Sequence, residues 1–257
     1  MNFTPLLSDT YVLTFLLLFV RFGSLFVFFP MLNHQSLLVQ VKAALTFYLA
    51  IIFYTQYPPI LPPDNFLTFM FMVLSEILFG FLAGVLLQIS FGVLAYAGEL
   101  IAFVMGFTMA SVMDPQTGSN TPIIANILNL VALMVFFALN VHHDIIIFMY
   151  NSLDFIPLGG FVTTSNMPEF IINASKEIFL VGFSIAFPVI ALSLLMDIIF
   201  GMIMKTMPQM NLLVIGFPIK ITISFIVIIA TVRAILEIFG QQFLKIFNQL
   251  PTIFFTQ

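Results

Sequence analysis

The sequence predicts an all-α protein in which about six long apolar helices form hairpins of the kind found in polytopic membrane proteins. Of its 257 residues, 61% are hydrophobic and only 7% are charged, against the ~25% charged that is typical of soluble domains. The apolar residues form long windows that are separated by breaks rich in Pro, Gly and polar residues. So few charges cannot cover the surface of an ordinary soluble globular protein, and that class is excluded.

The charge and cysteine content exclude several functions. The net charge is −4 with only seven Lys and Arg residues, so a basic surface for nucleic-acid phosphates is not predicted. The absence of cysteine excludes disulfides, thiolate metal sites and a cysteine nucleophile. The N-terminal residues lack the positive segment of a cleavable signal, so we expect the first apolar window to belong to the mature protein.

The apolar windows define the expected helices in chain order. Every window except the short second one reaches the ~20 residues that one membrane crossing needs. The breaks between them are predicted loops, because Pro removes a backbone donor and Gly permits positive φ. The windows cover residues 11–30, 43–57, 66–113, 122–141, 170–200 and 212–239.

The third window is unusual because its 48 residues are about twice the length of one crossing. It could form a hairpin, one very long helix, or a helix that continues outside the bilayer. Loop lysines prefer the cytoplasmic side of a membrane. Counting crossings backward from Lys205 on the inside, with residues 144–169 outside, places the break at Asp114 inside. The third window must then cross an odd number of times, which disfavours a simple hairpin.

Small residues recur at a spacing of four in the third window. Such rows let helix backbones approach closely. Packing within the same chain is the commoner explanation, but the length of the row slightly favours packing with partner subunits. The residues are Gly80, Gly84, Gly98, Ala102 and Gly106.

Among the charged residues inside apolar windows, we single out Arg21, Glu76, Glu99 and Asp197. Charge in hydrocarbon is energetically costly, so such residues are candidate functional groups. Glu76 and Glu99 are 23 residues apart, or about 34 Å along one helix, and cannot form a carboxylate pair unless the window folds back. We therefore expect these charges to pair individually or to face protein or water, and not to form a proton relay.

The sequence offers no positive evidence for an enzyme, a cofactor or a metal. His142, His143 and Asp144 are adjacent, and adjacent helical residues point about 100° apart, whereas chelating pairs prefer the i, i+4 spacing. We interpret them as residues at a helix end, with proton-sensitive histidines as the alternative. Nucleophile elbow, P-loop and dinucleotide fingerprints are absent from the sequence.

The break at residues 105–122 begins with small, Met and Phe residues and ends in turn formers. Non-helical backbone at membrane depth persists only where it is buried in protein or lines a cavity. Inside an assembly its flexible Met side chains could form a deformable seal; otherwise it is a connecting loop. The candidate residues are Met105, Gly106, Phe107, Met109, Val112, Met113, Asp114 and Pro115.

The last third of the chain holds a second break and a mixed segment. The break is either a sharp reversal or a broken helix of the kind that marks transport sites. The segment at 236–257 alternates polar and apolar residues, which predicts an interfacial amphipathic helix or an extension of the sixth helix toward a partner. The residues of the broken-helix turn are Pro208, Gln209, Met210, Asn211, Gly216 and Pro218.

These breaks carry a resemblance to a known family. Its most specific part is Pro208-Gln209-Met210-Asn211 followed by Gly216-Phe217-Pro218, and Asp114-Pro115, Asn140-Val141-His142-His143 and Pro157-Leu158-Gly159 add to it. Over residues 11–239 the chain resembles the FliR family of bacterial flagellar type III export-apparatus proteins. That family is related to the SctT subunit of virulence type III secretion systems. Many members have Gly where Val141 stands.

The resemblance implies a function. The whole chain, 1–257, would be one all-helical subunit of an export gate in the bacterial inner membrane, at the flagellar basal body. It would complete a closed helical pore with FliP-like and FliQ-like subunits, beside FlhB-like and FlhA-like export proteins. Unfolded flagellar export substrates would pass through this pore, and the loop at 106–122 would plug it when closed.

A different class of function is a proton- or ion-coupled secondary transporter of a small solute. Broken helices and acids inside apolar windows favour it. The inverted repeat that many such transporters contain is not evident in the sequence.

Overall fold

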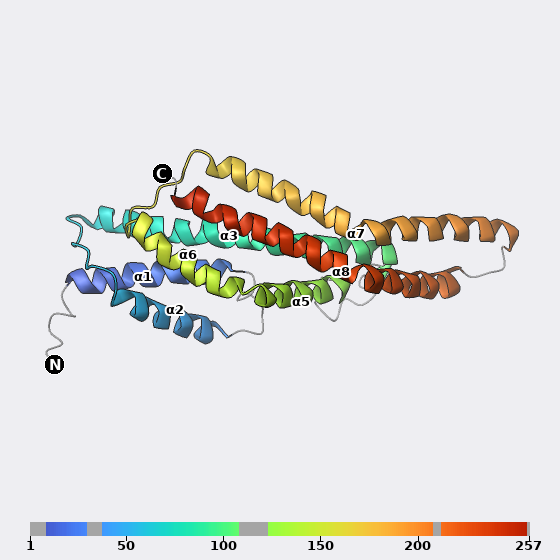
Figure 1. Cartoon of the computed structure of the whole chain (residues 1–257), viewed down its shortest axis with the longest axis horizontal. Helices are drawn as coiled ribbons and strands as arrows, with labels where there is room; N and C mark the ends of the chain where they lie inside the picture. The colour runs from blue at the N-terminus through green and yellow to red at the C-terminus, as the bar shows by residue number, and fades with distance from the viewer. Residues whose placement is uncertain (1–8, 30–37, 108–122, 208–211, 256–257) are drawn as a thin grey trace. The chain divides into compact units, whose positions relative to one another are not determined.

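The computed structural model describes residues 9–29, 38–107, 123–207 and 212–255. These residues form seven α-helices and no strand, which confirms the predicted all-α class (Figure 1). The helices are α1 (Asp9–Phe28), α2 (Val39–Tyr54), α3 (Phe66–Met105), α5 (Ile123–Ala138), α6 (Val141–Phe155), α7 (Met167–Thr206) and α8 (Leu212–Phe255).

Four of these helices, α1, α3, α7 and α8, are long and apolar enough to cross a membrane. A fifth span would consist of α5 and α6 together, which are separated by a break at Leu139 and Asn140. Helix α2 has 16 residues and is shorter than the ~20 residues of one crossing, as its short window predicted. The architecture is that of a helical membrane protein.

The third window contains one uninterrupted helix rather than a hairpin. Helix α3 has 40 residues and is therefore about 60 Å long, which agrees with the odd number of crossings expected from the lysines. Helix α8 has 44 residues and runs to Phe255. The mixed segment at its end is therefore continuous with the sixth predicted helix.

The chain divides into two compact units. Unit 1 comprises Met1–Ile89, Asn140–Ile172 and Lys245–Gln257, and unit 2 comprises Ser90–Leu139 and Asn173–Leu244. Helices α3, α7 and α8 contribute residues to both units.

Phenylalanine fills the core of each unit. In unit 1, the fully buried ring of Phe79 packs against Phe148, Phe161 and Phe254, with ring centroids 5.1–6.0 Å apart. In unit 2, Phe91, Phe136 and Phe243 form a mutual cluster with centroids 5.6–6.0 Å apart. Phe buries a large apolar area without a polar group that needs a partner, which suits a chain with 34 Phe and no Trp.

The long helices differ in how much of their apolar surface the chain itself covers. In α3, 61% of the most apolar window is buried, against 28% in α7 and 11% in α8. Large apolar side chains on α7 and α8, such as Leu180, Ile198 and Ile229, are more than 60% exposed. Apolar surface of this extent requires lipid or another protein as its neighbour.

Candidate functional site

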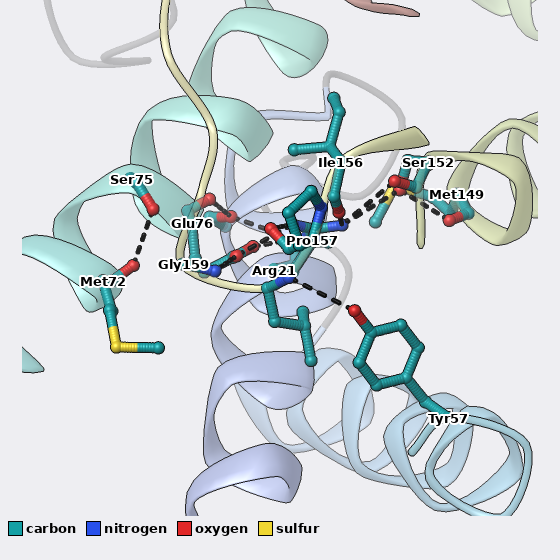
Figure 2. Close-up of polar contacts among 12 residues, drawn as sticks. Arg21, Tyr57, Met72, Ser75, Glu76, Met149, Ser152, Ile156, Pro157 and Gly159 are labelled. Atoms are coloured by element: carbon teal, nitrogen blue, oxygen red, sulfur yellow. Dashed lines mark hydrogen bonds and ion pairs between the residues drawn. The ribbon is translucent and has the colours of Figure 1, made fainter. Parts of the chain in front are cut away.

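Arg21 on α1 and Glu76 on α3 form an ion pair in the core of unit 1 (Figure 2). The guanidinium Nε donates to Oε2 of Glu76, and Nη2 donates to Oε1 at 2.8 Å. Both side chains are completely buried. Two of the four charges singled out in the sequence thus form one bidentate contact, the strongest geometry available to Arg and a carboxylate.

The same ion pair holds the loop between α6 and α7. Nη1 of Arg21 donates to the carbonyl oxygen of Ile156 at 3.1 Å, and Nη2 to that of Pro157 at 3.4 Å. Oε1 of Glu76 accepts the N–H of Gly159 at 2.5 Å. Figure 2 shows these groups converging on the two charges. The buried pair therefore connects α1, α3 and the Pro157-Leu158-Gly159 segment of the family resemblance.

Gly159 is required at its place in this cluster. Its φ is +78°, and an added Cβ would lie 2.7 Å from Cγ of Met72 on α3. The ring of Phe79 closes the cluster, with the Arg21 guanidinium carbon 5.0 Å from the ring centroid. The roles of Ile156, Pro157 and Gly159 were not predicted, because sequence spacing does not indicate which loop reaches a buried charge.

The other two predicted charges lie in unit 2 and are exposed. Asp197 on α7 accepts hydrogen bonds from Nζ of Lys220 on α8, at 2.8 Å to Oδ1 and 2.9 Å to Oδ2. Glu99 on α3 has no hydrogen-bond or ion-pair partner within the described ranges. Because α3 is continuous, Glu76 and Glu99 cannot act as a carboxylate pair.

The small-residue row of α3 packs closely against other helices of the same chain. A Cβ on Gly80 would lie 2.5 Å from the backbone N of Leu25 on α1, and one on Gly84 would lie 2.5 Å from Cβ of Phe28. In unit 2, a Cβ on Gly98 would lie 2.5 Å from Cα of Ala125 on α5. Packing within the same chain, the commoner explanation of the row, thus holds for these three glycines against α1 and α5. Packing of the row with partner subunits stays a prediction.

The remaining members of the row lie at the end of α3, in unit 2. Ala102 and Met105 are fully buried, and the helix ends at Met105, directly before Gly106, whose φ is +87°. The N–H of Gly106 donates to the carbonyl oxygen of Phe103 at 3.1 Å. A left-handed glycine directly after the last helical residue is a common way to end a helix.

The first turns of α8, which follow the second predicted break, contact this end of α3. The ring of Phe217 on α8 lies against Gly106, so that an added Cβ would be 2.8 Å from its Cδ1. The Ser193 hydroxyl on α7 donates to the carbonyl oxygen of Val104 at 2.9 Å. Gly216 and Pro218 flank Phe217 on the first turns of α8. Sequence reasoning had assigned no role to Ser193.

Several predicted site residues cannot be placed. Phe107 is described and half-buried. The rest of the predicted plug, and the centre of the broken-helix turn, lie outside the described residues: Met109, Val112, Met113, Asp114 and Pro115, and Pro208, Gln209, Met210 and Asn211.

The two histidines lie at a helix start, as predicted. Asn140, with φ of 56°, precedes α6, and the rings of His142 and His143 lie with centroids 4.1 Å apart and planes tilted by 43°. Among the residues that the structure describes, no group of three or more His, Asp or Glu is arranged to hold a metal ion.

Comparison with known proteins identifies the family. Residues 12–246 match the bacterial export proteins, family 1. The chain is 30% identical over 234 residues to the flagellar biosynthetic protein FliR of Bacillus subtilis, covering 89% of this chain and 90% of the relative. It is 31% identical over 228 residues to FliR of Escherichia coli, covering 87% and 86%.

A more distant relative links the chain to virulence secretion. The Yop proteins translocation protein T of Yersinia pestis is 26% identical over 223 residues, and the match covers 85% of each chain. The resemblance seen in the sequence is thus confirmed over nearly its whole length. The chain belongs to the bacterial export proteins, family 1, the family of the flagellar FliR proteins.

Proposed function

We propose that this chain is the subunit that completes a closed helical pore, together with FliP-like and FliQ-like subunits, in the flagellar protein export gate. The family match over residues 12–246 carries the proposal, and family membership makes the chain a membrane protein of the flagellar export apparatus. Unfolded flagellar proteins are the proposed cargo. The proposed role is non-enzymatic and needs no cofactor.

The exposed apolar surfaces support assembly with other chains. A helix buried over only 11% of its most apolar window, as α8 is, has surface to offer to lipid and to neighbouring subunits. We propose that FlhB-like and FlhA-like export proteins are further partners, and that the complex lies in the inner membrane at the basal body.

Co-purification tests this function directly. The tagged full-length chain, expressed with its FliP-like and FliQ-like subunits, should elute as one stable complex whose mass gives the copy number of each chain. A chain that purifies alone, and that moves a small solute after reconstitution, would contradict the gate and favour the secondary transporter.

We further propose that the segment at 106–122 closes the pore. The family resemblance suggests this role, and the described start of the segment supports it. Met105 is buried, and the chain leaves α3 at a left-handed glycine. The proposed closing residues are Met105, Gly106, Phe107, Met109, Val112, Met113, Asp114 and Pro115.

Deletion of residues 106–118 should raise ion leakage through the assembled gate several-fold, because the proposed seal is then missing. Conductance is measured on the purified complex in planar bilayers, after its subunit composition has been shown to match that of the unmodified gate. Unchanged conductance in a correctly assembled complex would contradict a closing role for this segment.

A further inference from the structure

Glu99 on α3 is an exposed acid that the chain's own cations do not balance. The structure pairs Glu76 with Arg21, and Asp197 with Lys220. All seven Lys and Arg residues of the sequence lie in the described segments, and none of them forms an ion pair with Glu99. A Lys or Arg that balances Glu99 therefore comes from another molecule.

The surface beside Glu99 is apolar. Phe103 lies one turn further along the same face of α3 and is 68% exposed. The two neighbouring faces of the helix are covered within unit 2, because Gly98 packs closely against α5 and the Tyr96 ring packs against Phe179 on α7. Glu99 and Phe103 thus form a stripe, one carboxylate and one ring, that the described part of the chain leaves uncovered.

The chemistry of this stripe selects its neighbour. Hydrocarbon covers the Phe103 ring but leaves the Glu99 carboxylate in a medium where charge is costly. Water solvates the carboxylate but not the ring. A Lys or Arg on an apolar helix satisfies both groups, because its hydrocarbon stem packs on apolar surface while its charged head reaches the carboxylate.

We propose that Glu99 and Phe103 form a docking site for an apolar helix of a neighbouring subunit, and that an Arg or Lys of that helix binds the Glu99 carboxylate. This rests on the gate assembly proposed above and assigns one of its contacts. Arg is the better fit, because its planar guanidinium binds both oxygens of a carboxylate, as Arg21 does with Glu76 in unit 1.

Co-purification of Glu99 variants tests the site. Glu99→Gln keeps the size of the side chain and removes its charge, so the partner's cation would be buried without an anion. We expect the amount of partner recovered with the tagged full-length chain, after a fixed detergent challenge, to fall about tenfold or more. Glu99→Lys should abolish recovery, and Glu99→Asp should retain more partner than Glu99→Gln. Thermal unfolding of the isolated chain should not change in these variants, because Glu99 has no polar contact within the described residues.

A charge exchange identifies the partner residue. In the Glu99→Lys background, each Lys and Arg within the apolar windows of the co-purified subunits is changed to Glu in turn. One such change should restore recovery of the complex, and the same change beside unmodified Glu99 should weaken it, because two carboxylates would then meet. If no position restored recovery, the proposed cation would be contradicted.

Asp64 provides the matched control. It is exposed in the loop before α3 and also lacks an ion pair, but it lies outside any helix, so Asp64→Lys should leave recovery unchanged. The cysteine-free sequence also allows single reporters. In the assembled complex, a charged maleimide should label Phe103→Cys several-fold more slowly than Asp64→Cys, because a helix covers Phe103.

The outcomes separate the docking site from the proposed function. If the unmodified chain recovers no partner, the gate assembly fails and the docking site fails with it. In a complex that does form, normal recovery with both Glu99→Gln and Glu99→Lys would overturn the docking site alone. Labelling of Phe103→Cys as fast as that of Asp64→Cys would also overturn it, because the stripe would then face water.

Discussion

Arg21→Met is expected to destabilise unit 1 strongly. The guanidinium is completely buried and forms the bidentate contact with Glu76. Without it, the carboxylate stays buried without a cation, which destabilises proteins by about 3–5 kcal/mol. Total stabilities are only about 5–15 kcal/mol. The free energy of unfolding in mild detergent, and the amount of membrane-integrated chain, measure the effect.

Companion variants show whether the unpaired charge or the lost hydrogen bonds cause most of the stability loss in Arg21→Met. Glu76→Leu in the Arg21→Met background removes the unpaired charge and should restore part of the stability. Full recovery is not expected, because the carbonyl of Ile156 loses its donor and the N–H of Gly159 loses its acceptor. The charge exchange Arg21→Glu with Glu76→Arg should fail, because a carboxylate would then face the carbonyls of the loop.

The matched control is Arg233→Met. Arg233 is 90% exposed and pairs with Glu237 one helical turn away on α8, so its loss should change stability by less than about 1 kcal/mol. If Arg21→Met were no more destabilising than Arg233→Met, the buried pair would have no role in holding α1, α3 and the α6–α7 loop together.

The features of the fold that could be predicted from the sequence are those that depend on the number and order of its apolar residues. The all-α class and the absence of a hairpin in 66–113 follow from window length and lysine placement, and α3 agrees with both. The sequence also identified Arg21 and Glu76 as costly charges, since each interrupts an apolar window.

Contacts between distant segments could not be predicted from spacing. Arg21 and Glu76 are 55 residues apart, and the periodicity of each helix does not indicate which helices are neighbours. The contact of Gly106 with Phe217 depends on a local backbone angle and a ring position, neither of which has a sequence pattern. The glycine row predicted close approach, but it could not distinguish α1 and α5 from a partner subunit.

Gly80→Ala is expected to be the next most damaging change. The added Cβ would lie 2.5 Å from the backbone N of Leu25, and a backbone atom cannot turn aside as a flexible side chain can. Helix α1 would have to move away from α3, and overpacking of this kind typically costs about 1–3 kcal/mol. The control is Gly201→Ala on α7, where nothing lies within 4 Å of the added carbon. There the higher helix propensity of Ala should stabilise the chain by up to about 1 kcal/mol.

The effects of Gly80→Ala and Arg21→Met should not add. Ser24, beside Gly80, donates from its hydroxyl to the carbonyl oxygens of Arg21 and Glu76 at 3.0 and 3.2 Å. Moving α1 away from α3 therefore also disturbs the ion pair, and neighbouring sites of this kind are coupled by about 0.5–3 kcal/mol. In a double-mutant cycle of unfolding free energies, the double variant should lose less than the sum of the two single losses. Strict additivity would mean that the glycine contact and the ion pair hold α1 against α3 independently.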